Sequence, residues 1–432
     1  MNPDTAASFR AGVARRDIAP PQPRLLKPTG MGRPHPTRGV LDPLFVEALA
    51  VQAAGRTGFV ITADLRTFEP KWVTSIRETV ADRTGCDPWA ILFSSTHNHC
   101  SSPAAADNSP VAVAAAEEAN LKICDATVAA CCAAFESMRP AEWASATTHL
   151  AAPIGENRRM RFSGGICLNS WGAGPIVPPG RRITGPAGPD STRIDMMAVR
   201  APGAASPFAL LVSYATHPHL YELPAFSGEF PGAAKRILAE RLPGTTILHA
   251  NHAGGDIDIH CVHPMPDDPE AKIAWFQESA HRMGERFADA VVPAIPADGY
   301  TRPADLRHTH FTTEHQVTDP AQRPVYINAL ALGDTALLSI PGELFHELGR
   351  QIHADCPFSS LCLMAYNGSG AYMAPPIGFE QGGYEVMRGT SFPRPGEDPL
   401  SPRPRRVPVP MNMGTRVVEE ARKLLERLHR AG

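Results

Sequence analysis

Short apolar runs that end in polar or glycine-rich sequence constrain the fold of this chain more than any other feature. Runs of about four to eight apolar residues bounded by turn formers are typical of buried strands. They occupy residues 59–63, 90–93, 208–214, 245–248 and 335–340. Helical patterns lie between several of them, at residues 72–84, 111–135, 232–242, 271–291 and 344–354. Because strands that alternate with helices form layered structures, we predict an α/β fold of mixed β-sheet layers flanked by helices.

The length of 432 residues allows two or three domains or one large one. No shift in composition marks a boundary, so we predict a single domain over residues 1–432. An amphipathic pattern predicts a closing helix at residues 417–430. The 44 prolines concentrate in connections. They predict long loops at residues 164–191 and 392–413, which either serve the site or contact a second copy in a homo-oligomer.

Composition and charge exclude several classes of protein. Hydrophobic residues make up 43% of the chain, which is enough for a packed core. The formal net charge of −3 gives no electrostatic reason to expect a nucleic acid partner. No stretch reaches the roughly 18 consecutive apolar residues that a membrane span needs. The first residues lack a signal-peptide pattern and the nine cysteines form no CxxC pair, so we predict a cytoplasmic protein with reduced thiols.

Histidines gather at the ends of the predicted strands. Two strands end in the pattern Thr-His-x-His, at residues 96–99 and 216–219. Positions i and i+2 of an extended chain point to the same side, so each pair can aim two imidazoles at one point. A third strand ends at Glu343. Because ligands gather at the carboxyl ends of strands, we predict a divalent metal site there. The pair at residues 308–310 lies among alternating polar residues and is expected to be an ordinary part of a strand.

Residues 251–260 form a further candidate element around a Gly-Gly-Asp turn. The two glycines allow the backbone to come close to a ligand or a metal. If the chain is extended there, Asp256 and Asp258 share a face, so that one can orient a metal-bound histidine and the other can act as general base. An ordinary Asx turn is the alternative. Arg158 can hold a substrate carbonyl or carboxylate, unless its segment is only a solvated basic loop.

Taken in order, these motifs resemble the N-terminal catalytic domain of the neutral/alkaline (non-lysosomal) ceramidase family. The similar segments are residues 11–20, 31–32, 63–64, 95–103, 157–158, 215–218, 227–229, 341–343, 367–372 and 381–385. The resemblance spans about residues 10–392. It implies one catalytic zinc ion with four ligands, which are His97, His217, Glu343 and Tyr372. It also implies that His99 and Arg158 line the substrate site, where they stabilise the developing negative charge, and that Tyr384 lies close by.

The sequence departs from the family pattern at two site positions and at its end. Asp258 stands where the family has its proposed serine nucleophile, so we predict attack by zinc-bound water with Asp258 or Asp256 as the base. His219 stands where the family usually has another residue, which favours a more polar substrate, or even a second metal. Too few residues follow residue 392 for the family's C-terminal immunoglobulin-like domain. We therefore do not expect a lipid presented by a membrane.

These observations predict a zinc-dependent hydrolase of an amide or related acyl bond in a small polar substrate. Arg158, His219 and Tyr384 are the predicted substrate contacts. The same scaffold could hydrolyse an ester, a lactone or a glycoside, and a non-catalytic binding protein is the alternative from another class. Manganese or iron could replace zinc, because geometry as well as residue type selects the metal.

Overall fold

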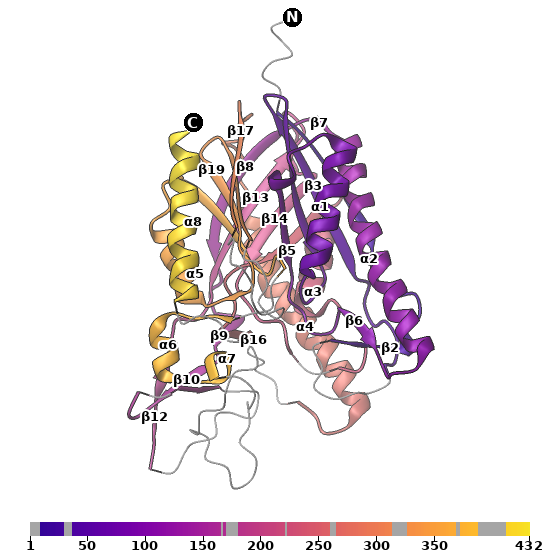
Figure 1. Ribbon diagram of the computed structural model, residues 1–432, viewed down its shortest axis with the longest axis vertical. Helices are drawn as coiled ribbons and strands as arrows, with labels where there is room; N and C mark the ends of the chain where they lie inside the picture. Colours follow the sequence, from indigo (N-terminus) through magenta and orange to yellow (C-terminus); the bar gives the residue numbers. More distant parts are fainter. Residues whose placement is uncertain are drawn as a thin grey trace, which may run out of the picture.

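Three mixed β-sheets form the scaffold of the molecule and share one four-stranded topology, to which the first sheet adds the short strand β7 (Figure 1). In each sheet, antiparallel strands lead to one parallel pair, and a helix connects the two parallel strands. The computed structural model describes residues 9–29, 37–165, 167–169, 180–220, 223–259, 265–312, 326–368, 372–387 and 412–432. The prediction of mixed α/β layers flanked by helices is confirmed.

The first sheet has the strand order β5-β4-β3-β1-β7. Its strands are β1 (Arg10–Asp17), β3 (Phe45–Ala53), β4 (Arg56–Ala63), β5 (Ile91–Ser95) and β7 (Arg139–Pro140). Helix α1 (Pro70–Thr84) joins the parallel strands β4 and β5, and α2 (Pro110–Glu136) packs beside it. Gly85 ends α1 in a left-handed conformation with φ of 70°, as glycine does at many helix ends.

The second and third sheets repeat this arrangement. The second, in the order β15-β14-β13-β8, contains β8 (Glu142–His149), β13 (Arg193–Arg200), β14 (Ala209–Tyr214) and β15 (Thr246–Asn251). The third, in the order β17-β18-β19-β21, contains β17 (Leu306–Thr312), β18 (Tyr326–Leu332), β19 (Thr335–Ser339) and β21 (Ser360–Met364). The connecting helices are α3 (Glu229–Arg241) and α5 (His346–Ala354). Helices α4 (Pro269–Val291) and α8 (Met413–Arg430) cover α3 and α5.

Smaller elements lie around the ends of the sheets. They are β2 (Leu26–Pro28), β6 (Pro103–Ala105), β9 (Gly155–Asn157), β10 (Arg159–Phe162), β11 (Cys167–Asn169), β12 (Ile183–Pro186), β16 (Ile257–Ile259), β20 (Glu343–Leu344) and β22 (Tyr372–Met373), with the short helices α6 (Pro376–Gln381) and α7 (Tyr384–Met387). Single 3-10 turns occupy Pro23–Leu25, Pro88–Ala90 and Val292–Ala294. In Figure 1, β9, β10, β16, α6 and α7 lie together below the three sheets.

The three sheets share an inner core that brings their parallel strands together. Its apolar side chains come from all three sheets and include Leu49, Val60, Leu92, Leu211, Leu248, Leu337 and Met364. Hydroxyl groups add bonds between sheets. Ser94 Oγ donates to the carbonyl of Ala365 at 2.9 Å, and Ser339 Oγ donates to that of Phe93 at 2.7 Å. As a result, the carboxyl ends of strands from different sheets meet.

Most predicted elements are confirmed, and one needs correction. Each of the five predicted strands is present, and the predicted helices appear with shifts of a few residues at their ends. The closing helix begins at Met413, earlier than the predicted residue 417. The stretch 164–191 is not a loop throughout, because β11 and β12 pair with β10 within it. The predicted loop at 392–413 lies almost entirely outside the described residues, as does the turn at 31–32.

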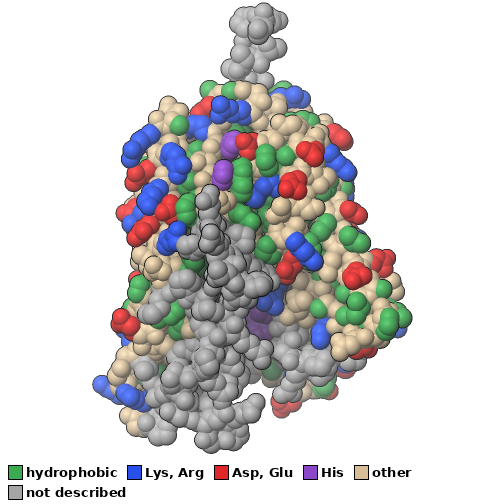
Figure 2. Space-filling view, viewed as in Figure 1, with side chains coloured by type: hydrophobic (Ala, Val, Ile, Leu, Met, Phe, Trp, Pro, Cys, Tyr) green, Lys and Arg blue, Asp and Glu red, His purple; other side chains and the backbone are tan. Residues whose placement is uncertain are grey.

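No helix among the described residues is long and apolar enough to cross a membrane. Figure 2 shows a face on which acidic and basic side chains are intermixed rather than gathered into a patch of one sign. The eight cysteines within the described ranges are all free thiols.

Candidate metal centre

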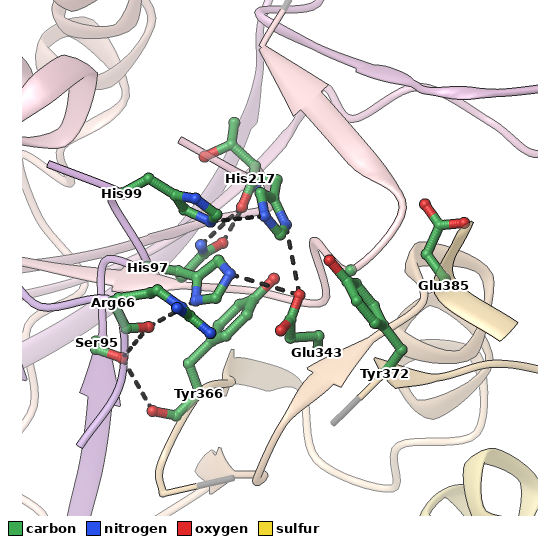
Figure 3. Close-up of polar contacts among 12 residues, drawn as sticks. Arg66, Ser95, His97, His99, His217, Glu343, Tyr366, Tyr372 and Glu385 are labelled. Carbon is green, nitrogen blue, oxygen red and sulfur yellow. Dashed lines mark hydrogen bonds and ion pairs between the residues drawn. The ribbon is translucent and has the colours of Figure 1, made fainter. Parts of the chain in front are cut away.

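Three side chains from the ends of strands in different sheets meet at one point (Figure 3). His97 follows β5, His217 follows β14, and Glu343 follows β19. His97 Nε2 lies 3.5 Å from Glu343 Oε2, and His217 Nδ1 lies 3.7 Å from the same oxygen. Each of the three residues is at most 3% exposed. The structure therefore brings together three of the four predicted ligands.

The chemistry of this cluster fits a bound cation. None of the three facing atoms has a hydrogen-bond partner among the described residues, although buried polar atoms normally have one. Zinc holds nitrogen and oxygen ligands at about 2.0–2.2 Å, and tetrahedral geometry then separates two ligands by about 3.3–3.6 Å. The separations of 3.5 and 3.7 Å are close to this range. A divalent ion would satisfy all three atoms at once.

The outer nitrogens of both imidazoles lie within hydrogen-bond distance of a neighbour. His97 Nδ1 lies 2.6 Å from the carbonyl oxygen of Arg66, which can only accept, so the proton is on Nδ1 and Nε2 is unprotonated. His217 Nε2 lies 2.9 Å from His99 Nε2, and when His217 donates this hydrogen bond its Nδ1 presents a lone pair toward Glu343. Burial, with Arg158 nearby, lowers the pKa of His217 well below its usual value. His97 Nε2 therefore has the form of a metal ligand, and so does His217 Nδ1 in the tautomer that donates to His99.

Tyr372, the fourth predicted ligand, lies at the border of this cluster. Strands β20 and β22 are parallel and place Tyr372 beside Glu343. The Tyr372 ring is stacked 6.4 Å from that of His217, and Figure 3 shows its hydroxyl directed toward His217 and Glu343. Arg158 Nη2 donates to this hydroxyl at 3.0 Å. The pairing of two very short strands, which sequence patterns do not reveal, is what places the phenol here.

Arg158 is a buried residue that holds other parts of the site. Its Nε donates to Glu385 Oε1 at 2.8 Å, and its Nη2 donates to the carbonyl of Gly255 at 2.9 Å as well as to Tyr372. The alternative of a solvated basic loop does not apply, because Arg158 is 2% exposed. Its contact with Tyr372 makes it a positioning residue in this structure, and its predicted contact with substrate stays a prediction.

The remaining histidines of the two pairs lie on the other side of His217. The ring centroids of His99 and His219 are 4.7 Å apart, and those of His99 and His217 are 4.8 Å apart. Burial, together with the charges of Arg158 and His97, lowers the pKa of His219 to about 4. The four histidines of the two Thr-His-x-His segments thus lie together. The pair at residues 308–310 does not join them, since His310 stacks on Trp89 at 4.0 Å.

The two candidate bases differ in their contacts. Asp256 accepts hydrogen bonds from Asn157 Nδ2 and from the backbone N–H of His346, both at 2.7 Å. Asp258 is half-buried, and its backbone forms a parallel bridge with that of His217. Burial raises the pKa of Asp258 to about 6, although Arg158 acts in the opposite direction. Asp256 therefore ties β9 to α5, whereas the backbone of Asp258 pairs with that of the candidate ligand His217.

The two glycines of the turn are required by close backbone contacts. A Cβ atom at Gly254 would lie 2.4 Å from the carbonyl oxygen of Thr216. A Cβ atom at Gly255 would lie 2.3 Å from that of Glu343. The predicted close approach is thus to the two backbone segments that carry His217 and Glu343.

Sequence reasoning missed several residues of the site. Tyr366 stacks on the ring of His97 at 4.1 Å, and its buried hydroxyl has no hydrogen-bond partner within the described part of the chain. Tyr366, His97 and Glu229 have φ values of 63°, 61° and 48°, whereas of the other described non-glycine residues only Ala54 has a positive φ. Such backbone strain is common at functional sites. The apolar run before Tyr366, residues 361–365, was the available signal.

Asn251 connects the two Thr-His segments. Its Nδ2 donates to the carbonyl oxygens of Thr96 at 3.0 Å and Thr216 at 2.7 Å, and its Oδ1 accepts from the N–H of Thr216. Its own carbonyl accepts from the N–H of Ala365 at 2.7 Å. This one residue therefore ties together segments that follow strands of all three sheets. Tyr384 begins α7, but its side chain lies outside the described residues.

The fold is that of the neutral ceramidases. The crystal structure of neutral ceramidase from Pseudomonas aeruginosa is similar to this chain with a TM-score of 0.67 and 12% sequence identity, over 88% of this chain and 71% of that one. A ceramidase complexed with C2 is similar with the same TM-score and identity, over 88% of this chain and 72% of that one. No family model matches the sequence, and no curated protein matches it. The resemblance noted from the motifs is confirmed at the level of the fold.

Proposed function

We propose that this protein is a zinc-dependent hydrolase of an amide bond in a small polar substrate. The observation that carries the proposal is the cluster of His97 Nε2, His217 Nδ1 and Glu343 Oε2, three buried atoms that face one another without hydrogen bonds among the described residues. The similarity in fold to ceramidases, whose name denotes cleavage of an amide, supports the choice of bond.

We assign different roles in hydrolysis to the residues of the site. A divalent ion held by His97, His217, Glu343 and Tyr372 would act as a Lewis acid toward the substrate carbonyl and the attacking water. The carbonyl of Arg66 keeps the imidazole of His97 in the required tautomer, and His99 can accept the proton of His217 Nε2. Arg158 holds the phenol of Tyr372 in place.

Proton transfer is assigned to Asp258 rather than Asp256. Asp258 lies beside His217, while both carboxylate oxygens of Asp256 are engaged by Asn157 and His346. Asp258 accepts a proton from the attacking water and returns it to the departing amine. This role needs no nucleophile from the chain, which agrees with an aspartate at this position.

Oxyanion stabilisation is assigned to Tyr366 together with His99. The Tyr366 hydroxyl is buried beside His97 and has no partner among the described residues, so it can donate a hydrogen bond to the carbonyl oxygen as negative charge develops. The groups around the centre are imidazoles, phenols and a guanidinium, with His219 next to His99. Such surroundings favour a polar acyl group or amine over a long lipid chain.

The test combines metal analysis with a substrate panel. Purified protein is expected to hydrolyse short N-acyl amides faster than long-chain ceramides, and a His97→Ala variant is expected to lose activity together with one equivalent of zinc. His149→Ala is the matched control, since that exposed histidine lies at the end of β8. The proposal is refuted if the His97→Ala variant keeps both the zinc content and the hydrolysis rate of the wild type. Matched ester and amide pairs decide which bond is preferred.

A further inference from the structure

A second buried histidine–carboxylate cluster lies outside the candidate metal centre. It consists of Asp195 on β13, His252 directly after β15 and His353 near the end of α5. His252 Nε2 lies 2.9 Å from His353 Nε2, which in turn lies 3.3 Å from Asp195 Oδ2. We propose that these three residues form a second zinc site, distinct from the first and independent of the proposed hydrolase function.

Hydrogen bonds alone cannot satisfy the three facing atoms. His252 Nδ1 accepts from the N–H of Ala253 at 2.7 Å, so a neutral His252 carries its proton on Nε2. That proton can be donated to His353 Nε2, which is then an acceptor and cannot donate to Asp195. Asp195 Oδ2 indeed has no hydrogen-bond donor among the described residues. Two imidazole nitrogens and one carboxylate oxygen thus share a single proton, and a divalent cation would satisfy all of them.

The surroundings prepare Asp195 Oδ2 as a ligand. Asp195 Oδ1 accepts from Arg193 Nε and Thr147 Oγ1, both at 2.9 Å, which leaves Oδ2 directed toward the histidines. Metal-bound carboxylates are commonly held by such bonds. Two imidazoles with one carboxylate favour zinc over magnesium or calcium, which prefer oxygen ligands. The His353 side chain is 11% exposed, so an ion can enter from solvent.

Metal binding requires two local changes. His252 Nε2 and His353 Nε2, which lie 2.9 Å apart, move to the separation of about 3.3–3.6 Å that tetrahedral zinc ligands need. An ion on His252 Nε2 moves the imidazole proton to Nδ1, so the hydrogen bond from Ala253 N–H is lost. His346, whose ring centroid lies 6.1 Å from that of His252, can stay in place, because its Nδ1 faces the carbonyl of Ala253.

The second ion would stabilise the backbone segments that position Glu343 in the first site. Helix α5 begins three residues after Glu343, and the turn after His252 packs Gly255 against the carbonyl of Glu343. An ion that joins β13, α5 and this turn would restrain the backbone that carries Glu343. We assign it a structural role.

Zinc stoichiometry tests the second site separately from the first. Protein purified without added metal and then loaded with zinc is expected to hold about two equivalents, His97→Ala and His353→Gln about one each, and the double variant none. An Asp195→Asn variant, which keeps the shape of the side chain, is expected to match His353→Gln. Cobalt bound to His97→Ala should give a visible spectrum that is absent from the double variant.

The outcomes separate the two sites. If His97→Ala holds no zinc, or if His353→Gln and Asp195→Asn both keep the wild-type stoichiometry in folded protein, the second site is refuted. If His97→Ala keeps the wild-type content while His353→Gln loses one equivalent, the second site stands and the first is refuted. Circular dichroism establishes that each variant is folded, and exposed His149→Ala is the control. A chelator is expected to lower the Tm of His97→Ala but not that of the double variant.

Discussion

Asp64 and Glu343 are buried carboxylates that follow corresponding strands, β4 and β19, in two sheets of the same topology, yet their partners differ. Asp64 Oδ2 accepts from Lys235 Nζ at 2.7 Å and from the N–H of Phe45 at 2.9 Å. Glu343 Oε2 faces imidazole nitrogens at 3.5 and 3.7 Å with no hydrogen bond in the described part of the molecule. A buried charge needs compensation. For Asp64, a lysine on α3, the helix that joins the parallel strands of the second sheet, supplies it, whereas the surroundings of Glu343 leave room for a metal ion.

The largest effect is expected when the charge of Glu343 is removed. Glu343→Gln keeps the volume of the side chain but weakens metal binding, because an amide is a poor zinc ligand. A metal ion contributes several kcal/mol to the transition state, so kcat/KM is expected to fall roughly 1,000-fold or more. Zinc analysis and initial rates provide the measurement. The comparison with Asp64 fails if Glu343→Gln keeps both its zinc and its activity.

A smaller effect on catalysis is expected from Tyr366. Tyr366→Phe retains the stack on His97 and removes only the hydroxyl. Loss of one oxyanion donor is expected to lower kcat roughly 100-fold while zinc content and KM stay nearly constant. Steady-state kinetics with metal analysis separate this outcome from loss of the site. An unchanged kcat would remove Tyr366 from the mechanism. Tyr326→Phe, which changes a tyrosine at the start of β18, is the control.

Asn251 tests whether the convergence of the sheets depends on one side chain. Asn251→Ala removes its bonds to Thr96 and Thr216 and leaves their buried backbone groups unpaired. The free energy of unfolding is expected to fall by about 3 kcal/mol. Urea unfolding measures it, and Thr79→Ala on the exposed face of α1 is expected to change it by less than about 0.5 kcal/mol. Equal effects of the two substitutions would contradict this role.

The sequence was informative where metal-ligating residue types directly follow a predicted strand. Apolar runs located five of the strands, and the repeated Thr-His-x-His pattern located His97 and His217 at the ends of two of them. Tyr366 was missed because its strand was not recognised. The structural role of Asp256 depends on contacts with residues 90 or more positions away, which periodicity does not reveal. The threefold repetition of topology was invisible because it is a property of strand pairing and leaves no repeat in the sequence.

The smallest effect is expected from the carboxylate–lysine cluster of the first sheet. Glu47 Oε1 accepts a hydrogen bond from Lys235 at 2.8 Å. Burial raises the pKa of Glu47 from 4.5 to about 7; the charge of Asp64 acts in the same direction, and Lys235 and Thr62 oppose it. Because the folded state binds the proton more tightly than the unfolded state, this group favours folding below about pH 4.5 and loses that contribution as the pH rises through about 7. Glu47→Gln removes the dependence.

The difference in unfolding free energy between wild type and Glu47→Gln is therefore expected to shift by ~2 kcal/mol against the wild type between pH 5.5 and 8. Urea titrations at the two pH values measure it. Glu229, whose pKa burial raises to about 8, titrates in both proteins, so its contribution cancels in the difference. Parallel pH profiles for the two proteins would show that Lys235 keeps Glu47 ionised throughout. The lysine would then compensate both carboxylates fully, and the contrast with Glu343 would become sharper.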